Sequence, residues 1–430
     1  MKYKNIVIGL SVAVYASACS PEFENGTVDI DSWVTSEMPE ISINHPCLMH
    51  TAADFKYVKE KVDARMQPWL MGYQTLEESP RAKSNYRATP IETTERPGSG
   101  QNQTNWDGSA AYQLALMWKF TGKKEYADAA IGVLNDWAYT NKAMKGNERI
   151  LTAGFCGYVY ANAAEIMRDY EGWRPEDLEQ CKKWLSTVVA PICHEWLTNH
   201  FGGKAEEQWL SWDLPAMVTL LSIGILNDDV ESIQFVYDYF FNGAGPGNIE
   251  NAVICMHADP DGNVLGEHLA QSQEVGRDSG HMTLNVPLYG YLCQMFYNIG
   301  IDLFSYQDNL ILDICEYVAK YNVYPNEAVN MPFTPYYKPG KQGWMTVISQ
   351  NDNGKDRGRA RPGWELIYNH YKVRGANPYY SRQFAREMRP EGDGHRNSAE
   401  SGDLGFGTLM FTREPIEPGE DEYHLPRREY

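Results

Sequence analysis

Four residues that could transfer protons or bind anions, Glu274, Arg277, Asp278 and His281, lie close together in the stretch QEVGRDSGHMTLNV. An apolar, aromatic segment that predicts a helix follows directly. Residues four apart share one face of a helix, so Arg277 and His281 are expected to lie side by side. A histidine next to an arginine suits proton transfer beside a negatively charged group. A capped helix start, in which Arg277 only pairs with Asp278 or Glu274, explains the same residues without chemistry.

Polar and aromatic side chains gather at other predicted helix starts and loops. These groups are Asn105, Trp106 and Asp107; Gln208, Trp209 and Trp212; Tyr336, Tyr337 and Lys338 in a proline-rich loop; and Arg359 and Arg361 before an aromatic helix. Amides, arginines and a helix N-terminus can bind carboxylates. Each group also has a structural explanation: a helix cap for Asn105, core packing for the tryptophans, and turn packing for the loop. No metal-binding or phosphate-binding motif is present, so we expect no metal and no cofactor.

The composition limits the class of partner. A formal net charge of −19 in 430 residues argues against nucleic acid, but a locally positive site could still bind an anionic polysaccharide. Aromatic residues make up 13% of the chain, with 28 Tyr and 12 Trp. Flat aromatic rings with polar edges suit a carbohydrate cleft, and they are equally suited to a core.

The N-terminus has the pattern of an exported lipoprotein. Lys2 and Lys4 precede the apolar segment 6–16, and Ala16-Ser17-Ala18-Cys19 follows. Small residues before a cysteine are typical of a bacterial lipoprotein cleavage site, after which Cys19 would carry the lipid; an ordinary secretion signal is the alternative. We therefore predict a signal peptide at 1–19, a tether at 20–44 and an outer-membrane lipid anchor in the cell envelope. The other seven cysteines have no metal-like spacing and are expected to be mostly buried free thiols.

Helical periodicity dominates the rest of the chain. The predicted helices are 107–120, 124–139, 159–170, 175–196, 209–226, 230–241, 282–299 and 309–320. Helices of this length joined by Gly- and Pro-containing loops predict an all-α fold, an (α/α) barrel or toroid of helical hairpins. The loops 79–104 and 326–362 are long enough to carry function. We predict a short β element at 404–411, one catalytic domain over 45–413 and a polar tail at 414–430.

Taken in order, these segments resemble one family. GRDSGH with the following MTLNVPLYGYLCQMFYNIGIDLFSY is similar to a segment of alginate-lyase-like polysaccharide lyases, and HPCLMHTAADFKYVKEKV is similar to their start. EQWLSWDLPAMVTLLSIGILNDD resembles their Asn-Trp helix, and RPGWELIYNHY with LGFGTLMFTR resembles the closing segments of polysaccharide lyase family 38. The resemblance covers roughly 45–413 and implies an (α/α) barrel with alginate lyase or glucuronan lyase activity. Gln208 departs from the pattern, because such enzymes often carry Asn there.

The resemblance implies metal-independent β-elimination of a 1,4-linked uronate polymer. Donors must neutralise the uronate carboxylate, a base must take the C5 proton, and an acid must protonate O4. We assign Tyr336 as acid, and as base where both groups leave from one side, and His281 as the second base. Gln208 and Arg277 would bind and neutralise the uronate carboxylate. The cleft would be lined by Asn105, Trp106, Trp209, Tyr337 and Arg361.

Two other classes of function fit parts of the sequence. A glycoside hydrolase would need two carboxylates flanking the bond, and Asp107, Asp213 and Glu274 are available. A surface glycan-binding lipoprotein without activity would also need the aromatic residues and the lipid anchor. Among lyases, glucuronan is the alternative substrate to alginate.

Overall fold

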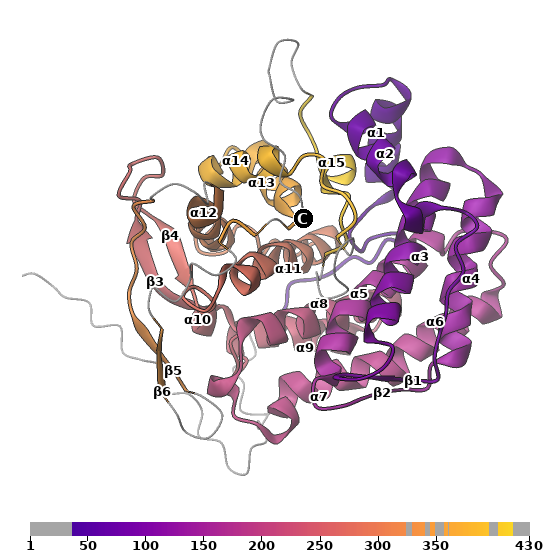
Figure 1. The fold of residues 1–430 in the computed structure, drawn as a ribbon, viewed down its shortest axis with the longest axis horizontal. Coiled ribbons are helices and arrows are strands. Elements are labelled where there is room, and N and C mark those ends of the chain that lie inside the picture. Colours follow the sequence, from indigo (N-terminus) through magenta and orange to yellow (C-terminus); the bar gives the residue numbers. More distant parts are fainter. Residues whose placement is uncertain are drawn as a thin grey trace, which may run out of the picture.

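The computed structural model describes residues 37–323, 329–339, 345–348, 357–359, 361–394 and 403–415, with the backbone alone described for 345–348. Helices form most of this part of the chain and are arranged in a ring, with the N-terminal half on the right and the C-terminal half on the left of Figure 1. The all-α class is therefore confirmed. No helix within the described ranges is both long and apolar enough to cross a membrane.

Long helices packed side by side form the inner part of this ring. They are α3 (Gln101–Thr121), α5 (Arg149–Met167), α8 (Leu210–Leu226) and α11 (Ser279–Asn298), with α13 (Trp364–Val373) next to α11. Each helix packs against the next, and α5 and α8 are buried on nearly every side. Their sequences are apolar around the whole circumference, which is the pattern of a helix with no solvent-facing side.

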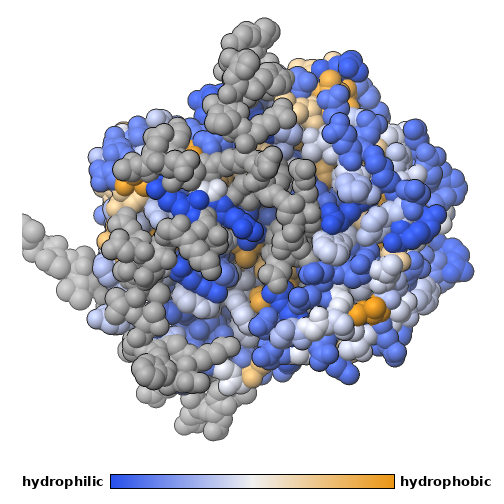
Figure 2. Space-filling model, in the orientation of Figure 1, coloured by the Kyte–Doolittle hydropathy of each residue, from blue (hydrophilic) through white to orange (hydrophobic). Residues whose placement is uncertain are grey.

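Amphipathic helices cover these inner helices. They are α4 (Lys124–Thr140), α6 (Pro175–Trp184), α7 (Ala190–Asn199), α9 (Val230–Asn242), α12 (Leu310–Val323) and α14 (Tyr379–Met388). The remaining α-helices of the described residues are α1 (Ala52–Asp63), α2 (Trp69–Glu78), α10 (Ile249–Ala252) and α15 (Gly407–Met410). The predicted helix 175–196 is α6 and α7 joined by a π-helical turn at Leu185–Val189. The face over α3, α4 and α6 is largely hydrophilic, with scattered apolar residues (Figure 2).

The strands form three two-stranded ribbons. β1 (Thr93–Glu95) pairs in parallel with β2 (Ala143–Lys145), and β3 (Val253–Ala258) pairs antiparallel with β4 (Glu267–Ser272). β5 (Tyr336–Pro339) pairs antiparallel with β6 (Met345–Ile348). The two long loops predicted from the sequence therefore contain β1 and the β5–β6 ribbon.

Several helix ends follow the sequence signals. Thr51 and Asp54 form a reciprocal capping box at the start of α1, and Gly122 ends α3 in the left-handed conformation. All seven cysteines among the described residues are free, and six of them are buried, as predicted.

The predicted β element at 404–411 is wrong. Gly405 and Phe406 have positive φ angles, and the one-turn helix α15 follows them. The Phe406 N–H donates to the carbonyl of Gly392, and α15 packs against α2, where the backbone of Leu409 lies against Gly72. Tertiary contacts thus bend a segment whose apolar alternation resembles a strand.

Candidate active site

The starts of the central helices lie at one end of the ring. β1 and β2 run in parallel directly before α3 and α5, so the starts of these two helices are neighbours. The first N–H groups of α8 are capped from the segment before α11: Leu210 N–H donates to Gln273 Oε1 and Ser211 N–H to Glu274 Oε1, both at 2.9 Å. Such N–H groups have no partner within their own helix, so these bonds tie the starts of α8 and α11 together.

His281 is oriented by Asp278. Asp278 is the N-cap of α11 and accepts the His281 N–H at 2.8 Å, while its carboxylate lies 2.7 Å from His281 Nδ1. Burial alone would raise the pKa of Asp278, but the bonds from His281 and the charge of Arg277 lower it to about 2. A carboxylate on Nδ1 leaves Nε2 to accept a proton, and the imidazole is 37% exposed. This pair has the geometry of an oriented general base.

Arg277 lies outside the helix, so the expectation that it shares a helix face with His281 is wrong. α11 begins only at Ser279, because Asp278 caps it. The guanidinium of Arg277 lies 3.2 Å from Glu274 Oε2, and its Cζ is 4.4 Å from the ring centre of Trp209. The ion pair weighed from the sequence is thus present, and Arg277 and His281 both lie next to the carboxylate of Asp278.

Gln208 and Trp209 directly precede α8, and Trp209 is its N-cap residue. Gln208 is buried, and its side-chain amide donates to the carbonyl of Lys204 at 2.8 Å. Its backbone carbonyl accepts from Gln273 Nε2 at 3.2 Å and from the ammonium of Lys338. These contacts place Gln208, Trp209 and Lys338 beside Arg277 in one cluster.

Tyr336 joins the same cluster from β5. Its hydroxyl donates to the carbonyls of Gln273 and Val275, the latter at 3.0 Å, and the residue is buried. Burial, assisted by the charge of Glu274, raises the pKa of Tyr336 above its ordinary value. Tyr337, its neighbour on the strand, is 68% exposed. The two tyrosines considered from the sequence therefore differ sharply in environment.

Arg361 reaches the start of α11 from the segment before α13. Its Nε–H donates to the carbonyl of Gly280 at 3.2 Å, and its Nη1 lies 3.8 Å from the buried carboxylate of Asp403. Arg361 therefore braces the turn that carries Asp278 and His281.

Asn105 and Trp106 lie on the more distant helix α3. The interpretation of Asn105 as a helix cap is wrong, because α3 begins at Gln101 and Gly100 is its N-cap. Asn105 is 1% exposed, and Trp106 has the guanidinium of Arg81 over its ring at 5.6 Å. Their described contacts keep them within the α3 wall rather than in the cluster around Arg277.

The three carboxylates available for a hydrolase, Asp107, Asp213 and Glu274, are buried and occupied by hydrogen bonds. Asp107 accepts from Tyr86, Thr89, Gln103 and Trp137. A hydrolytic general acid needs a carboxyl group with a raised pKa. Burial would raise the pKa of Asp213, but His200 and its other donors lower it.

Glu274 has a structural role as well, because it caps α8 and pairs with Arg277. The carboxylates named for hydrolysis thus hold the fold together.

Sequence reasoning missed Asp278 as the partner of His281 and Lys338 as a member of the cluster. The signal for Asp278 was local, an aspartate three residues before a histidine at a helix start, which matches capping geometry. The signal for Lys338 was not local, because its contacts lie 130 and 132 residues away in the chain.

A group that could hold a metal ion lies elsewhere, at the N-terminal side of the fold. The side-chain donor atoms of His45, Cys47 and Glu165 are within 4.8 Å of one another. Glu165 already contacts His45 Nδ1 at 2.7 Å and Arg168 Nε at 3.0 Å, and His45 Nε2 lies 3.1 Å from Asp228. These ion pairs give the group a structural role in fixing the segment before α1 to α5.

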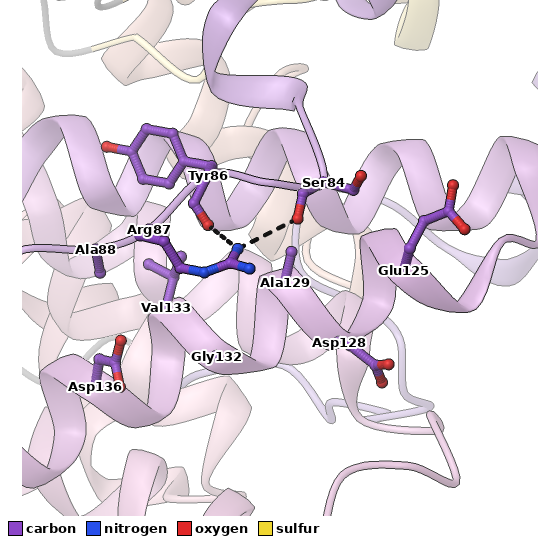
Figure 3. A pocket seen from close by; sticks show the side chains of 10 residues that line it. All are labelled: Ser84, Tyr86, Arg87, Ala88, Glu125, Asp128, Ala129, Gly132, Val133 and Asp136. Atoms are coloured by element: carbon purple, nitrogen blue, oxygen red, sulfur yellow. Dashed lines mark hydrogen bonds between the residues drawn. The ribbon is translucent and has the colours of Figure 1, made fainter.

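Two cavities of about 340 Å³ each contain none of the predicted site residues. One lies between the segment 84–88 and α4 and includes Glu125, Asp128 and Asp136, with Arg87 bound to the carbonyls of Ser84 and Tyr86 (Figure 3). Its acidic lining is unsuited to a polyanion.

The other cavity lies between the start of α1 and the C-terminal ends of α11 and α13, and its two arginines, Arg374 and Arg413, are paired with Asp302 and Asp54. The opposite end of these helices, with Arg277, Lys338 and His281, is the candidate active site.

Residues 77–328 match the family model described as alginate lyase, which is more than half of the chain. The chain belongs to the alginate lyase family. As a member of this family it is a polysaccharide lyase. Comparison with curated proteins finds no match.

The lyase resembles solved structures of alginate lyases in fold. An alginate lyase from Bacteroides ovatus has a TM-score of 0.53 at 12% identity, covering 86% of this chain and 100% of that one. Alginate lyase A1-III from Sphingomonas species A1 has a TM-score of 0.52 at 14% identity, covering 84% and 95%. A variant of A1-III complexed with a tetrasaccharide has a TM-score of 0.53 at 14% identity, covering 84% and 94%. At these identities the likeness concerns the fold.

Proposed function

We propose that this enzyme cleaves 1,4-linked uronate polymers of the alginate type by β-elimination. The observation that carries the proposal is the Asp278–His281 pair beside Arg277, at the joined starts of α8 and α11. An oriented imidazole next to a cation is what proton abstraction beside a carboxylate requires.

In the proposed reaction, Arg277 neutralises the uronate carboxylate, assisted by Gln208. The C5 proton passes to His281 Nε2, the C4–O4 bond breaks, and a C4–C5 double bond forms. Tyr336 donates its proton to the departing O4. Burial raises the pKa of Tyr336 and so keeps its hydroxyl protonated, as the donor role requires. In same-side elimination the same tyrosine would also take the C5 proton.

The walls of the proposed cleft are aromatic. Trp106, Trp209 and Tyr337 would contact the sugars with the parts of their rings that Arg81, Arg277 and Lys338 leave uncovered. Asn105 and Arg361, which are largely buried, would support the walls. Trp106 stands on α3 and Trp209 directly before α8, so a polymer across this end of the ring could contact both.

We also propose that the enzyme is a lipoprotein attached to the outer membrane through Cys19. The support is the N-terminal pattern of positive, apolar and small residues before this cysteine, which lies outside the described residues. An anchored lyase would act on polymer at the cell envelope.

The test is to incubate the protein with polymannuronate, polyguluronate and glucuronan separately. Elimination produces a conjugated unsaturated uronate that absorbs in the ultraviolet, whereas hydrolysis produces new reducing ends without this absorbance. Absorbance from either alginate block supports the proposal. Absorbance from glucuronan alone would make the enzyme a glucuronan lyase. Binding of the polymers without new chain ends would contradict catalysis.

A further inference from the structure

Lys338 is a buried lysine at the edge of the proposed site. It lies on β5, two residues after Tyr336, and is 3% exposed. Its ammonium donates to the backbone carbonyl of Glu206 at 2.7 Å and to that of Gln208. A lysine is rarely buried unless its charge is satisfied, and here backbone carbonyls satisfy it.

The same ammonium also lies over an aromatic ring. Lys338 Nζ is 4.9 Å from the ring centre of Trp209, and Arg277 Cζ is 4.4 Å from it. Two cations therefore lie near the ring of Trp209, whose electron-rich face attracts positive charge. Lys338 thus contacts both residues that precede α8 and belong to the proposed site.

The turn before α8 depends on contacts from outside itself. Trp209 provides no side-chain cap, and a 3₁₀ turn at Ala205–Glu207 leads into it. The turn is held from the α11 side by Gln273 and from the β5 side by Lys338. A neutral side chain at position 338 would leave the two carbonyls without this donor, which costs free energy in a buried place.

We propose that Lys338 is a positioning residue of the lyase reaction, whose ammonium fixes the Gln208–Trp209 turn against the strand that carries Tyr336. The inference rests on the proposed function and deepens it. Lys338 acts through Gln208 and Trp209, because its own ammonium is enclosed by protein. The bonds it makes set the distance between the tyrosine strand and the cationic wall formed by Arg277 and Trp209.

The charge of Lys338 is sensitive to weakly alkaline pH. Burial lowers the pKa of Lys338 to about 8, against the attraction of Glu274, Asp213 and Glu206 and together with the repulsion of Arg277. Lys338 is therefore fully protonated well below this pH and loses its positive charge as the pH rises through it. An arginine at the position would keep its charge throughout.

The test compares K338M and K338R with K204M, using the full chain and the alginate block that the wild type cleaves. Lys204 belongs to the same turn, but its side chain is 68% exposed, so K204M removes a nearby charge without removing the bonds to the carbonyls. Folding of each variant is checked by its thermal melt. We expect K338M to lower kcat by about 10²-fold, the scale for a misplaced catalytic group, with a much smaller change in KM. K204M should be normal, and K338R should recover part of the rate.

The alkaline limb of kcat against pH provides the second readout, because a purely structural role would not move it. We expect this limb to shift to higher pH in K338R. A folded K338M with activity within about threefold of the wild type would overturn the inference. A folded K338R that is as inactive as K338M would also overturn it. So would a K338R whose alkaline limb of kcat against pH lies at the same pH as that of the wild type. If the wild type itself forms no unsaturated product from any uronan, the proposed function fails and not the Lys338 assignment alone.

Discussion

The carboxylate of Asp278 lies 2.7 Å from Nδ1 of His281 and also caps the helix on which His281 stands. One side chain therefore fixes both the ring orientation and the backbone of the proposed base. D278N should keep the cap but favour the wrong tautomer of His281, and we expect kcat to fall by about 10²- to 10⁴-fold. Initial rates of unsaturated product measure this. D229N changes the N-cap of α9, which holds no histidine, and should be nearly normal. Equal activity of D278N and D229N would show that His281 does not take part in the proton transfer.

Arg277 should matter more for the transition state than for folding. R277M removes the cation beside the developing charge, and we expect a loss of about 10²- to 10³-fold in kcat/KM. R374M is the matched control, because Arg374 is also paired with an aspartate and lies near a tyrosine ring, but at the other end of the helices. If R277M cleaves polymer at the wild-type rate, Arg277 only compensates the charge of Glu274.

The two adjacent tyrosines can be separated by removing one oxygen from each. Y336F deletes the buried hydroxyl and should abolish most product formation; it should also cost about 1 kcal/mol of stability, the value of a hydrogen bond. Y337F changes an exposed residue and should affect KM at most. Denaturant unfolding and product formation are measured together. A Y336F enzyme that is less stable but fully active would show that Tyr336 only ties β5 to the segment 273–275.

A buried carboxyl group should make stability depend on pH. Glu316 accepts the N–H groups of Tyr380 and Ser381 at the start of α14, and burial raises its pKa to about 7 against these bonds. Between its ordinary pKa and 7, the folded protein holds a proton that the unfolded chain has released, so Glu316 lowers stability as the pH rises. The melting temperature of the wild type should therefore decrease relative to that of E316Q over this range. A constant difference between the two would show that Glu316 does not titrate there.

Membrane attachment should depend on Cys19. C19A should no longer incorporate a labelled fatty acid in the native host and should leave the membrane fraction, whereas C255A, which changes the one partly exposed thiol among the described residues, should have no effect. Labelling followed by cell fractionation measures both. Lipid incorporation into C19A would refute the assignment of this cysteine.

The sequence predicted the helices well and their junctions less well. The prediction of the all-α class was confirmed. The capping box at Thr51 and the end of α3 at Gly122 depend on neighbours in the chain. The start of α11 could also have been located, because the aspartate that caps it lies three residues before His281. Periodicity alone instead predicted a helix from 282, and the expectation that Arg277 and His281 share a face assumed a helix that already included Arg277.

Contacts between distant segments account for the remaining differences. The caps of α8 come from Gln273 and Glu274, 63 residues away, and the conformation of 404–411 depends on Gly392 and α2. The burial of Tyr336 and the position of Lys338 depend on the folding of β5 over the starts of two helices. No local pattern encodes such pairings, so sequence reasoning identified the tyrosine pair but not how differently its members are placed.

The joined starts of the central helices also bear on how such an enzyme can change. Three of the proposed functional groups precede three different central helices: Gln208 before α8, Arg277 before α11 and Arg361 before α13. The packed middles of these helices contribute no group to the reaction. A new substrate preference could therefore arise by altering one junction at a time, while the tightly packed centre, which tolerates little change in volume, stays as it is.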